Sequence, residues 1–168
     1  MTPSRTRCPH IRLRSAEAGD AASIYELETS CFDRAEEMFN RRQLQRLIAN
    51  PRAIVVVAER KGTIMGWAAG LLRRDRHRCS GRLYAIAVHP DAQGMGIGKK
   101  LTDYILKTLT SHGAQRIFLE VHAENQKAIN LYHKMGFIDR KYLTNYYGPH
   151  HHGIRMMRPA TITQRARD

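Results

Sequence analysis

The segment from residue 84 to residue 98 has the sequence YAIAVHPDAQGMGIG. Its first residues are mostly apolar, as in a buried strand. Glycine then recurs at Gly94, Gly96 and Gly98, and apolar residues at helical spacing begin at Ile97. Because the first backbone N–H groups of a helix have no partner within it, such a strand-to-helix turn predicts an anion site. A tight turn also needs glycine for its conformation alone, so the glycines by themselves leave a purely structural role open.

Two other phosphate-binding patterns match this stretch only in part. Gly94-x-Gly96-x-x-Lys99 supplies part of the G-x-G-x-x-G pattern of dinucleotide-binding folds, and no acidic residue ends a following strand at the usual distance. The G-x-x-x-x-G-K-[S/T] loop of nucleotide-binding proteins is absent from the sequence. A nucleotide bound in either of these ways is therefore not expected.

The flanking sequence predicts one α+β domain with a strand-helix-strand-helix centre. The expected strands cover residues 11–13, 54–58, 64–72, 82–88, 117–121, 138–146 and 153–157, and the expected helices cover 18–32, 40–49, 97–112 and 125–135. We assign residues 10–159 to this single domain, residues 1–9 to a disordered N-terminus and residues 160–168 to a basic C-terminal tail.

The chain carries a net charge of +13, and part of the excess lies in residues 73–82, where arginines surround His77. Such a segment attracts polyanions through long-range electrostatics, so acidic proteins, ribosomal surroundings and RNA are candidate partners. A solvated loop that keeps the protein soluble explains the same charge. The sequence leaves the oligomeric state open.

Cysteine usage, hydropathy and a histidine cluster bear on the compartment, on membrane association and on metal binding, respectively. Cys8, Cys31 and Cys79 are odd in number and lack a C-x-x-C pair, which favours a reducing cytoplasm. No apolar run approaches the roughly 20 residues of a membrane-spanning helix, so we expect no membrane association. The adjacent histidines 150–152 cannot easily all face one ion, and we expect no metal site.

Two motifs make residues 84–137 resemble the acetyl-CoA site of the GNAT superfamily of N-acetyltransferases. Gln93, Gly96 and Gly98 fill the Q/R-x-x-G-x-G/A motif of that superfamily. The second motif, NQKAINLYHKMGF at residues 125–137, fits N-x-x-A-x-x-L-Y-x-x-x-G-F and follows at the expected distance. The resemblance implies a GNAT fold, with a central twisted, mostly antiparallel sheet of about six or seven strands flanked by about four helices.

The resemblance also implies acetyl-CoA as co-substrate and assigns residues to hold it. Backbone groups of Ile86, Ala87 and Val88 are expected to bind the pantetheine arm. The residues expected at the pyrophosphate are Gln93, Gly94, Met95, Gly96, Ile97, Gly98 and Lys99. Asn125 is expected to hydrogen-bond acetyl-CoA near its thioester, whereas its place before a helix also fits a plain N-cap.

Glu120 and Tyr132 are the candidate catalytic pair. Glu120 lies in an otherwise apolar strand, where alternation alone favours the solvent face of the sheet. Residues 119–125, LEVHAEN, are similar to the L-E-V-R-x-S-N stretch of RimI-type protein N-terminal acetyltransferases, in which the glutamate is the proposed general base. His122 and Glu124 depart from that pattern. Tyr132 lies on the apolar face of its helix, as a core tyrosine would, and the resemblance implies instead a general acid for the CoA thiolate.

Tyr146 and Tyr147 are the candidate acceptor-binding residues. They belong to TNYYGP at residues 144–149, which resembles the N-Y-Y-x-P segment of RimI-type enzymes and contains a Gly-Pro turn signal. The resemblance implies the N-terminal α-amine of a protein or peptide as acceptor. An acetyltransferase for a polyamine, an antibiotic or an aminoacyl-tRNA would share the acetyl-CoA residues. A non-enzymatic acyl-CoA-binding or nucleic-acid-binding module would conflict with the intact catalytic pair.

Overall fold

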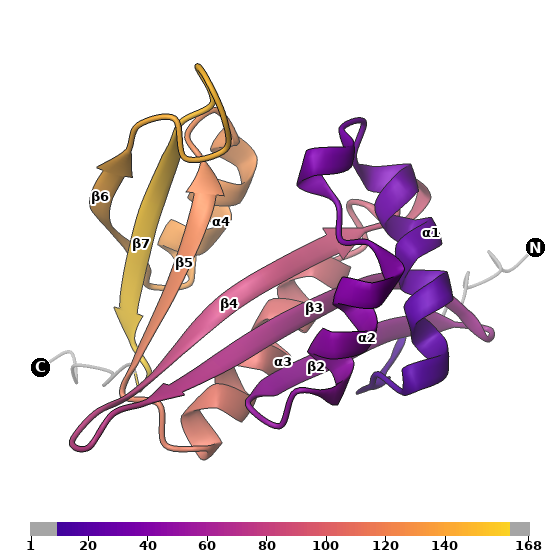
Figure 1. Ribbon diagram of the computed structural model, residues 1–168, viewed down its shortest axis with the longest axis horizontal. Coiled ribbons are helices and arrows are strands. Elements are labelled where there is room, and N and C mark those ends of the chain that lie inside the picture. The colour runs from indigo at the N-terminus through magenta and orange to yellow at the C-terminus, as the bar shows by residue number, and fades with distance from the viewer. Residues whose placement is uncertain (1–9, 162–168) are drawn as a thin grey trace, which may run out of the picture.

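The computed structural model describes residues 10–161, which form one seven-stranded sheet with four α-helices (Figure 1). The strands are β1 (Arg12–Ser15), β2 (Ala53–Arg60), β3 (Thr63–Arg74), β4 (Cys79–Val88), β5 (Arg116–His122), β6 (Ile138–Leu143) and β7 (Gly153–Pro159). The α-helices are α1 (Ala21–Cys31), α2 (Arg41–Ala49), α3 (Ile97–Ser111) and α4 (Gln126–Lys134), and short 3-10 turns are η1 (Ala18–Asp20), η2 (Ala35–Glu37) and η3 (Pro90–Ala92). The predicted α+β fold class is confirmed.

The strands follow one another across the sheet in the order β1-β2-β3-β4-β5-β7-β6. Every neighbouring pair is antiparallel except β4 and β5, which run parallel. A parallel pair needs a long crossover connection, and α3 supplies it. The glycine-rich segment lies where this crossover leaves the end of β4.

Helices cover the two faces of the sheet unequally. On one face, α1 and α2 pack over β2, β3 and β4, with Trp67 of β3 fully buried beneath them. On the other face, α3 and α4 enclose the larger core, which includes Leu101, Ile105, Ile117 and Phe137. Figure 1 shows α1 and α2 standing over the β2–β4 half of the sheet, with β5, β7 and β6 beside them. A site between β4 and β5 is therefore open toward the α1 side.

Most predicted elements begin or end one to three residues away from their observed bounds, and two of the differences at the C-terminal side have a clear physical reason. The strand predicted over residues 138–146 ends at Leu143, because Asn145 has a φ of 53° and the chain turns there. Ala160, assigned above to the C-terminal tail, is 7% exposed, and its N–H donates to the Gln115 carbonyl. The rest of the predicted termini, residues 1–9 and 162–168, lies outside the described residues.

The basic segment 73–82 forms the end of the β3–β4 hairpin, which projects from the sheet in Figure 1. The tip residues are exposed, and the Arg74 guanidinium donates to the His112 carbonyl at 2.8 Å. Arg82 differs from the other arginines, since it lies within β4 and is only partly exposed.

Within residues 10–161, no helix has the length and apolar character needed to cross a membrane. The same residues hold no group of three metal-ligating side chains close enough to bind an ion. Cys31 and Cys79 carry free thiols.

Candidate active site

β4 and β5 diverge partway along their length. Their parallel pairing ends at Leu83 and Leu119, whereas β4 continues to Val88 and β5 continues to His122. On their outer sides, β4 stays paired with β3, and β5 stays paired with β7. The gap between the two strands is therefore lined by backbone groups that the sheet leaves unpaired on that side.

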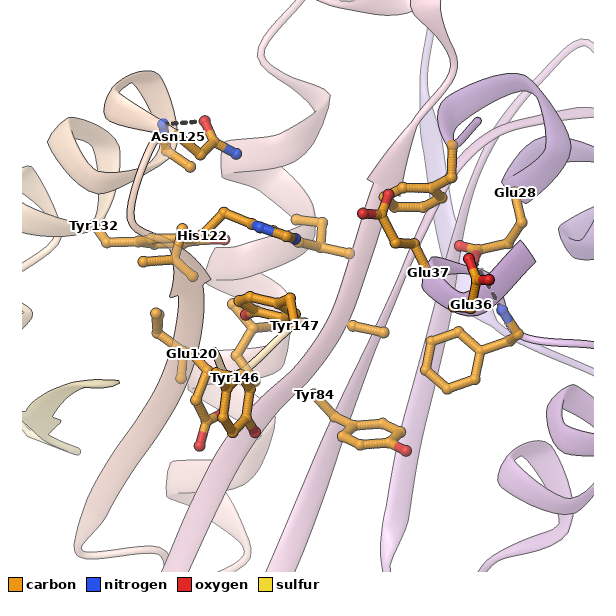
Figure 2. A pocket seen from close by; sticks show the side chains of 18 residues that line it. Glu28, Glu36, Glu37, Tyr84, Glu120, His122, Asn125, Tyr132, Tyr146 and Tyr147 are labelled. Carbon is orange, nitrogen blue, oxygen red and sulfur yellow. Dashed lines mark hydrogen bonds between the residues drawn. The ribbon is translucent and has the colours of Figure 1, made fainter. Parts of the chain in front are cut away.

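A cleft of about 520 Å³ occupies this gap and extends to α1 and η2 (Figure 2). Strands, helices and loops from both halves of the sheet contribute to its walls. The polar and aromatic side chains that line it belong to Glu28, Phe32, Glu36, Glu37, Phe39, Tyr84, Glu120, His122, Asn125, Tyr132, Tyr146 and Tyr147. The site residues predicted on β4, β5, α4 and the β6–β7 loop thus include six that share one cleft: Ile86, Glu120, Asn125, Tyr132, Tyr146 and Tyr147.

The end of β4 directs backbone groups toward the gap. The N–H of His89 donates to the Met65 carbonyl, on the β3 side. Because backbone groups alternate along a strand, the N–H and carbonyl of Val88 face the other way, toward β5. The Val88 carbonyl accepts from the Cys31 thiol at 3.3 Å, which leaves the N–H as the group that a carbonyl oxygen in the cleft could bind.

The glycine loop beyond β4 forms the predicted anion cradle. Gly94 has a φ of 81°, and Gly96, the N-cap of α3, has a φ of 77°. A Cβ atom added at either glycine would meet nothing within 4 Å, so the space over the loop is open. The exposed N-terminus of the 15-residue helix α3 adjoins that space, which fits a pyrophosphate.

Several side chains around the cradle are engaged elsewhere, so backbone groups are what the loop offers a ligand. Ile97 is 1% exposed and packs in the core, and Ala87 is buried against the α1 and α2 side. Gln93 donates from its side-chain amide to the Val88 carbonyl at 3.4 Å. Lys99 pairs with Asp103 at 3.2 Å, and Met95 is exposed. Gly98 follows in the first turn of α3.

Asn125 combines the two roles that the sequence left open. It is the N-cap of α4, and its Oδ1 accepts from the Ala128 N–H at 3.2 Å. The capping bond uses the oxygen and leaves the side-chain nitrogen free for another contact. Figure 2 shows that nitrogen directed toward the cleft.

Tyr132 extends from α4 to the cleft (Figure 2). Its ring packs edge-on against Phe137 at 5.8 Å, and the residue is 6% exposed. Among residues 10–161, its hydroxyl forms no hydrogen bond, and the oxygen is not fully buried because it borders the cleft. Burial raises the pKa of Tyr132 to about 12, so the hydroxyl keeps its proton at neutral pH.

Glu120 does not lie on a solvated face, so the expectation from strand alternation alone was wrong. Its side chain is 6% exposed and lines the cleft from β5. Arg82 places both Nε and Nη2 at 2.8 Å from Oε2 of Glu120. Arg155, opposite Glu120 on β7, donates from Nε to Oε1 at 3.1 Å. The face is buried because the β6–β7 loop and two arginine side chains cover it.

Tyr146 and Tyr147 reach the cleft from the β6–β7 loop. The Tyr146 hydroxyl accepts from Arg82 Nη2 at 3.0 Å. The Tyr147 ring stacks on His122 with centroids 3.7 Å apart, and burial raises its pKa. His122, which departs from the RimI-type pattern, therefore supports the loop that carries both tyrosines.

Comparison with known proteins agrees with this geometry. Residues 21–137, more than half of the chain, match the family model described as the acetyltransferase (GNAT) family. The chain belongs to the GNAT family. Both sequence motifs, the splayed strands and the catalytic candidates lie inside the matched range, and the predicted family is confirmed.

Individual relatives include acetyltransferases with different acceptors in their names. The chain is 34% identical over 91 residues to mycothiol acetyltransferase of Paenarthrobacter aurescens, covering 53% of this chain and 28% of that protein. It is 40% identical over 65 residues to the ribosomal protein bS18 alanine N-acetyltransferase of Escherichia coli K12, covering 39% and 44%. The chain thus spans less than half the length of these curated relatives.

A solved structure shows the same fold over almost the whole chain. The crystal structure of the ribosomal-protein-S18-alanine N-acetyltransferase from Escherichia coli superposes with a TM-score of 0.77 at 23% identity. The match covers 95% of this chain and 99% of that one, and it confirms the predicted GNAT fold.

Sequence reasoning missed the acidic wall of this GNAT cleft. Glu28 of α1 is 2% exposed; its Oε1 accepts from Trp67 Nε1 at 2.8 Å, and its Oε2 accepts from the Phe39 N–H at 3.2 Å. Burial raises the pKa of Glu28, although these two hydrogen bonds oppose the shift. A signal existed, because Glu28 follows Ile24 and Leu27 at the spacing of an apolar helix face. Glu36 and Glu37, on η2, carried no comparable signal.

The acidic residues that line the cleft contrast with the rest of the chain. Although the net charge is +13, no lysine or arginine lines the cleft among the described residues. Its acidic residues are Glu28, Glu36, Glu37 and Glu120. Because Arg82 and Arg155 are paired with Glu120, it is Glu36 and Glu37 that attract a cation to the cleft and disfavour an acidic group there.

Proposed function

We propose that this GNAT-family chain is an acetyl-CoA-dependent N-acetyltransferase that acts on the N-terminal α-amine of a protein or peptide. The observation that carries the proposal is that Glu120 and Tyr132 line one cleft, at the point where β4 and β5 part. A carboxylate from one strand and a protonated phenol from a helix supply the base and the acid that acyl transfer to an amine needs.

The donor is expected along the end of β4 and the start of α3. Ile86 to Val88 offer unpaired backbone groups, and the open glycine loop from Gly94 to Gly98 offers the amides of a helix N-terminus. Asn125 offers a side-chain nitrogen at the α4 end of the same cleft. These groups suit the pantetheine arm, the pyrophosphate and the thioester region of acetyl-CoA, in that order.

In the reaction, the amine nitrogen forms a bond to the thioester carbonyl carbon, and the carbon–sulfur bond breaks. Glu120 accepts the proton that the amine loses, directly or through a water molecule. The Val88 N–H donates to the carbonyl oxygen as negative charge develops on it. Tyr132 gives its proton to the departing thiolate and is reprotonated from solvent.

The charge of the cleft supports an amine as acceptor. The lower pKa of an α-amine favours it over a lysine side chain. Glu36 and Glu37 line the cleft and form no ion pair among the described residues, so their charge draws an ammonium group into it. An α-amine with a pKa of about 7.7 to 8.0 costs about 1 kcal/mol to deprotonate at pH 7, against roughly 4 to 5 kcal/mol for a lysine near 10.4. A single carboxylate base suits the easier of the two. The relative from Escherichia coli K12 is named as an alanine N-acetyltransferase of ribosomal protein bS18.

The exposed arginines of the β3–β4 hairpin add a second surface to this proposal. They lie outside the cleft lining and suit an acidic protein, ribosomal surroundings or RNA in a reducing cytoplasm. Acetylation of a target that contacts this surface should slow steeply with added salt, whereas acetylation of a short neutral peptide should not.

The acceptor class is tested by following CoA thiol release with a panel of amines. The panel contains a peptide with a free N-terminus, the same peptide with a formylated N-terminus and an internal lysine, a polyamine and an aminoacyl-tRNA. Release with the free N-terminal peptide alone supports the proposal. Faster release with the polyamine or the tRNA would assign a different acceptor, and no release with any member would contradict the acyltransferase function.

A further inference from the structure

Arg82 lies beside the cleft and contacts three of the residues that line it, Glu120, Tyr146 and Tyr84. It lies on β4, contacts Glu120 of β5 through two nitrogens, and donates from Nη2 to the Tyr146 hydroxyl of the β6–β7 loop. Its guanidinium carbon also lies 5.6 Å from the centre of the Tyr84 ring. The sequence alone assigned this residue to the basic segment 73–82, whose tip arginines have no such contacts with the cleft residues.

The hydrogen bonds to Glu120 distinguish its two carboxylate oxygens. A carboxylate has about four lone-pair positions, two on each oxygen. Oε2 accepts a hydrogen bond from Nε of Arg82 and also lies 2.8 Å from Arg82 Nη2, whereas Oε1 accepts a hydrogen bond from Nε of Arg155. Oε1 therefore retains room for one more donor, and Arg82 determines which oxygen that is.

We propose that Arg82 is a positioning residue for acyl transfer. It presents Oε1 of Glu120 to the acceptor amine, and its hydrogen bond to the Tyr146 hydroxyl, here called the latch, holds Tyr146 over that amine. The inference rests on the proposed function, in which Glu120 receives the amine proton. Arg82 acts through these two neighbours.

The loop that Arg82 latches is internally stiff. The Asn145 N–H donates to His152 Nδ1 at 3.0 Å, the His150 N–H donates to Asn145 Oδ1 at 3.0 Å, and the Tyr147 N–H donates to the His151 carbonyl. A loop with these bonds moves as a unit, so its position depends on a few contacts with the sheet. The Tyr146–Arg82 hydrogen bond and the Tyr147–His122 stack are two such contacts.

Arg155 provides a matched control. Its Nε donates a hydrogen bond to Glu120, as Arg82 does, but Arg155 donates none to the Tyr146 hydroxyl. Both Arg82→Met and Arg155→Met should lower kcat, since each removes a group that orients Glu120. Arg82→Met alone should raise the KM for the acceptor peptide, by about tenfold for a lost charge-assisted hydrogen bond. Neither should change the KM for acetyl-CoA. Equal acceptor KM values in the two variants would overturn the latch.

Tyr146→Phe closes the comparison as a mutant cycle. It removes only the hydroxyl that Arg82 contacts, so it should raise the acceptor KM as Arg82→Met does. Combining the two should raise the KM no further, because both remove the same bond. Additive effects of the two substitutions would overturn the proposal.

Hydrogen exchange tests the latch without any acceptor. Amides of residues 144–152 should exchange several-fold faster in Arg82→Met and in Tyr146→Phe than in the wild type, and at the wild-type rate in Arg155→Met. If Arg82→Met fails to fold, Tyr146→Phe carries the same test. Exchange at the wild-type rate in Tyr146→Phe would overturn the latch. If the variants exchange faster as expected but the wild type acetylates no peptide, the proposed function alone would be overturned.

Discussion

The indole Nε1 of Trp67 donates a 2.8 Å hydrogen bond to Oε1 of Glu28, and both residues are almost completely buried. The bond ties α1 to β3, and the second oxygen of Glu28 ties the Phe39 backbone to the same point. Phe39 follows η2, which carries Glu36 and Glu37. The acidic wall of the cleft is therefore anchored to the centre of the sheet.

Replacing Glu36 and Glu37 together with glutamine should weaken acceptor binding. The two carboxylates lie on the wall opposite Glu120 and attract an ammonium group through partly screened charge. We expect the KM for a peptide with a free N-terminus to rise roughly three- to tenfold at low salt, and less at high salt. The KM for acetyl-CoA should not change. Glu26→Gln is the control, since Glu26 is exposed on α1 outside the cleft, and an equal effect there would contradict a local role.

Gly96→Ala should weaken acetyl-CoA binding at least tenfold, about 1.4 kcal/mol, because a methyl group would enter the open space over the glycine loop. Alanine at a φ of 77° also strains the backbone by about 1 kcal/mol. Gly113→Ala is matched for that strain, since its φ is 95° and its surroundings are equally open. Calorimetric binding of acetyl-CoA to both variants separates the two effects. Equal losses of affinity would reject the anion cradle.

Glu120→Gln should lower turnover by roughly 10² to 10⁴ while leaving acetyl-CoA binding intact. Glutamine keeps the shape of the side chain but cannot take the amine proton. Turnover should recover at high pH, where the acceptor amine is already neutral. The control is Glu124→Gln, which lies two residues after the end of β5, is exposed and should retain wild-type turnover. Normal turnover of Glu120→Gln at pH 7 would show that another group is the base.

Tyr132→Phe should leave the thermal midpoint almost unchanged, because the hydroxyl has no partner among the described residues and the ring packing is kept. Turnover should fall by roughly 10² or more if the hydroxyl protonates the thiolate. The deficit should shrink with an acyl donor whose thiol is more acidic. Since the pKa of Tyr132 is about 12, its ionisation should cause no loss of wild-type activity between about pH 7 and pH 10. A destabilised but fully active variant would instead identify a core tyrosine.

The order of elements was predictable because each has a local signal. A β-branched run indicates β2, and the Lys61-Gly62 turn indicates β3 as its hairpin partner. Helical spacing indicates α3 and α4, and Gly113 and Gly136 indicate where those helices end. The strand predicted to reach residue 146 was too long, because the positive φ of Asn145 depends on its hydrogen bonds with His150 and His152. Those partners follow later in the chain and leave no pattern in the strand itself.

The donor side of the site was predictable from sequence, whereas the arrangement around Glu120 was not. The glycine loop and α4 are each formed by one continuous segment, so their motifs can be recognised from residue spacing in the sequence. Arg82 and Arg155 meet Glu120 from positions 38 and 35 residues away, and their contact depends on strand order and register. Alternation placed Glu120 on the correct face of its strand but could not show that this face is covered.

A bisubstrate compound, in which CoA is joined through an acetyl linker to the N-terminal nitrogen of a peptide, tests the central claim most directly. If donor and acceptor meet between β4 and β5, the compound should bind at least about 100-fold more tightly than CoA alone, measured by calorimetry. The same peptide joined through an internal lysine is the control and should bind much less tightly. Equal affinity for CoA and for the N-terminally joined compound would contradict acetyl transfer to a peptide α-amine at this cleft.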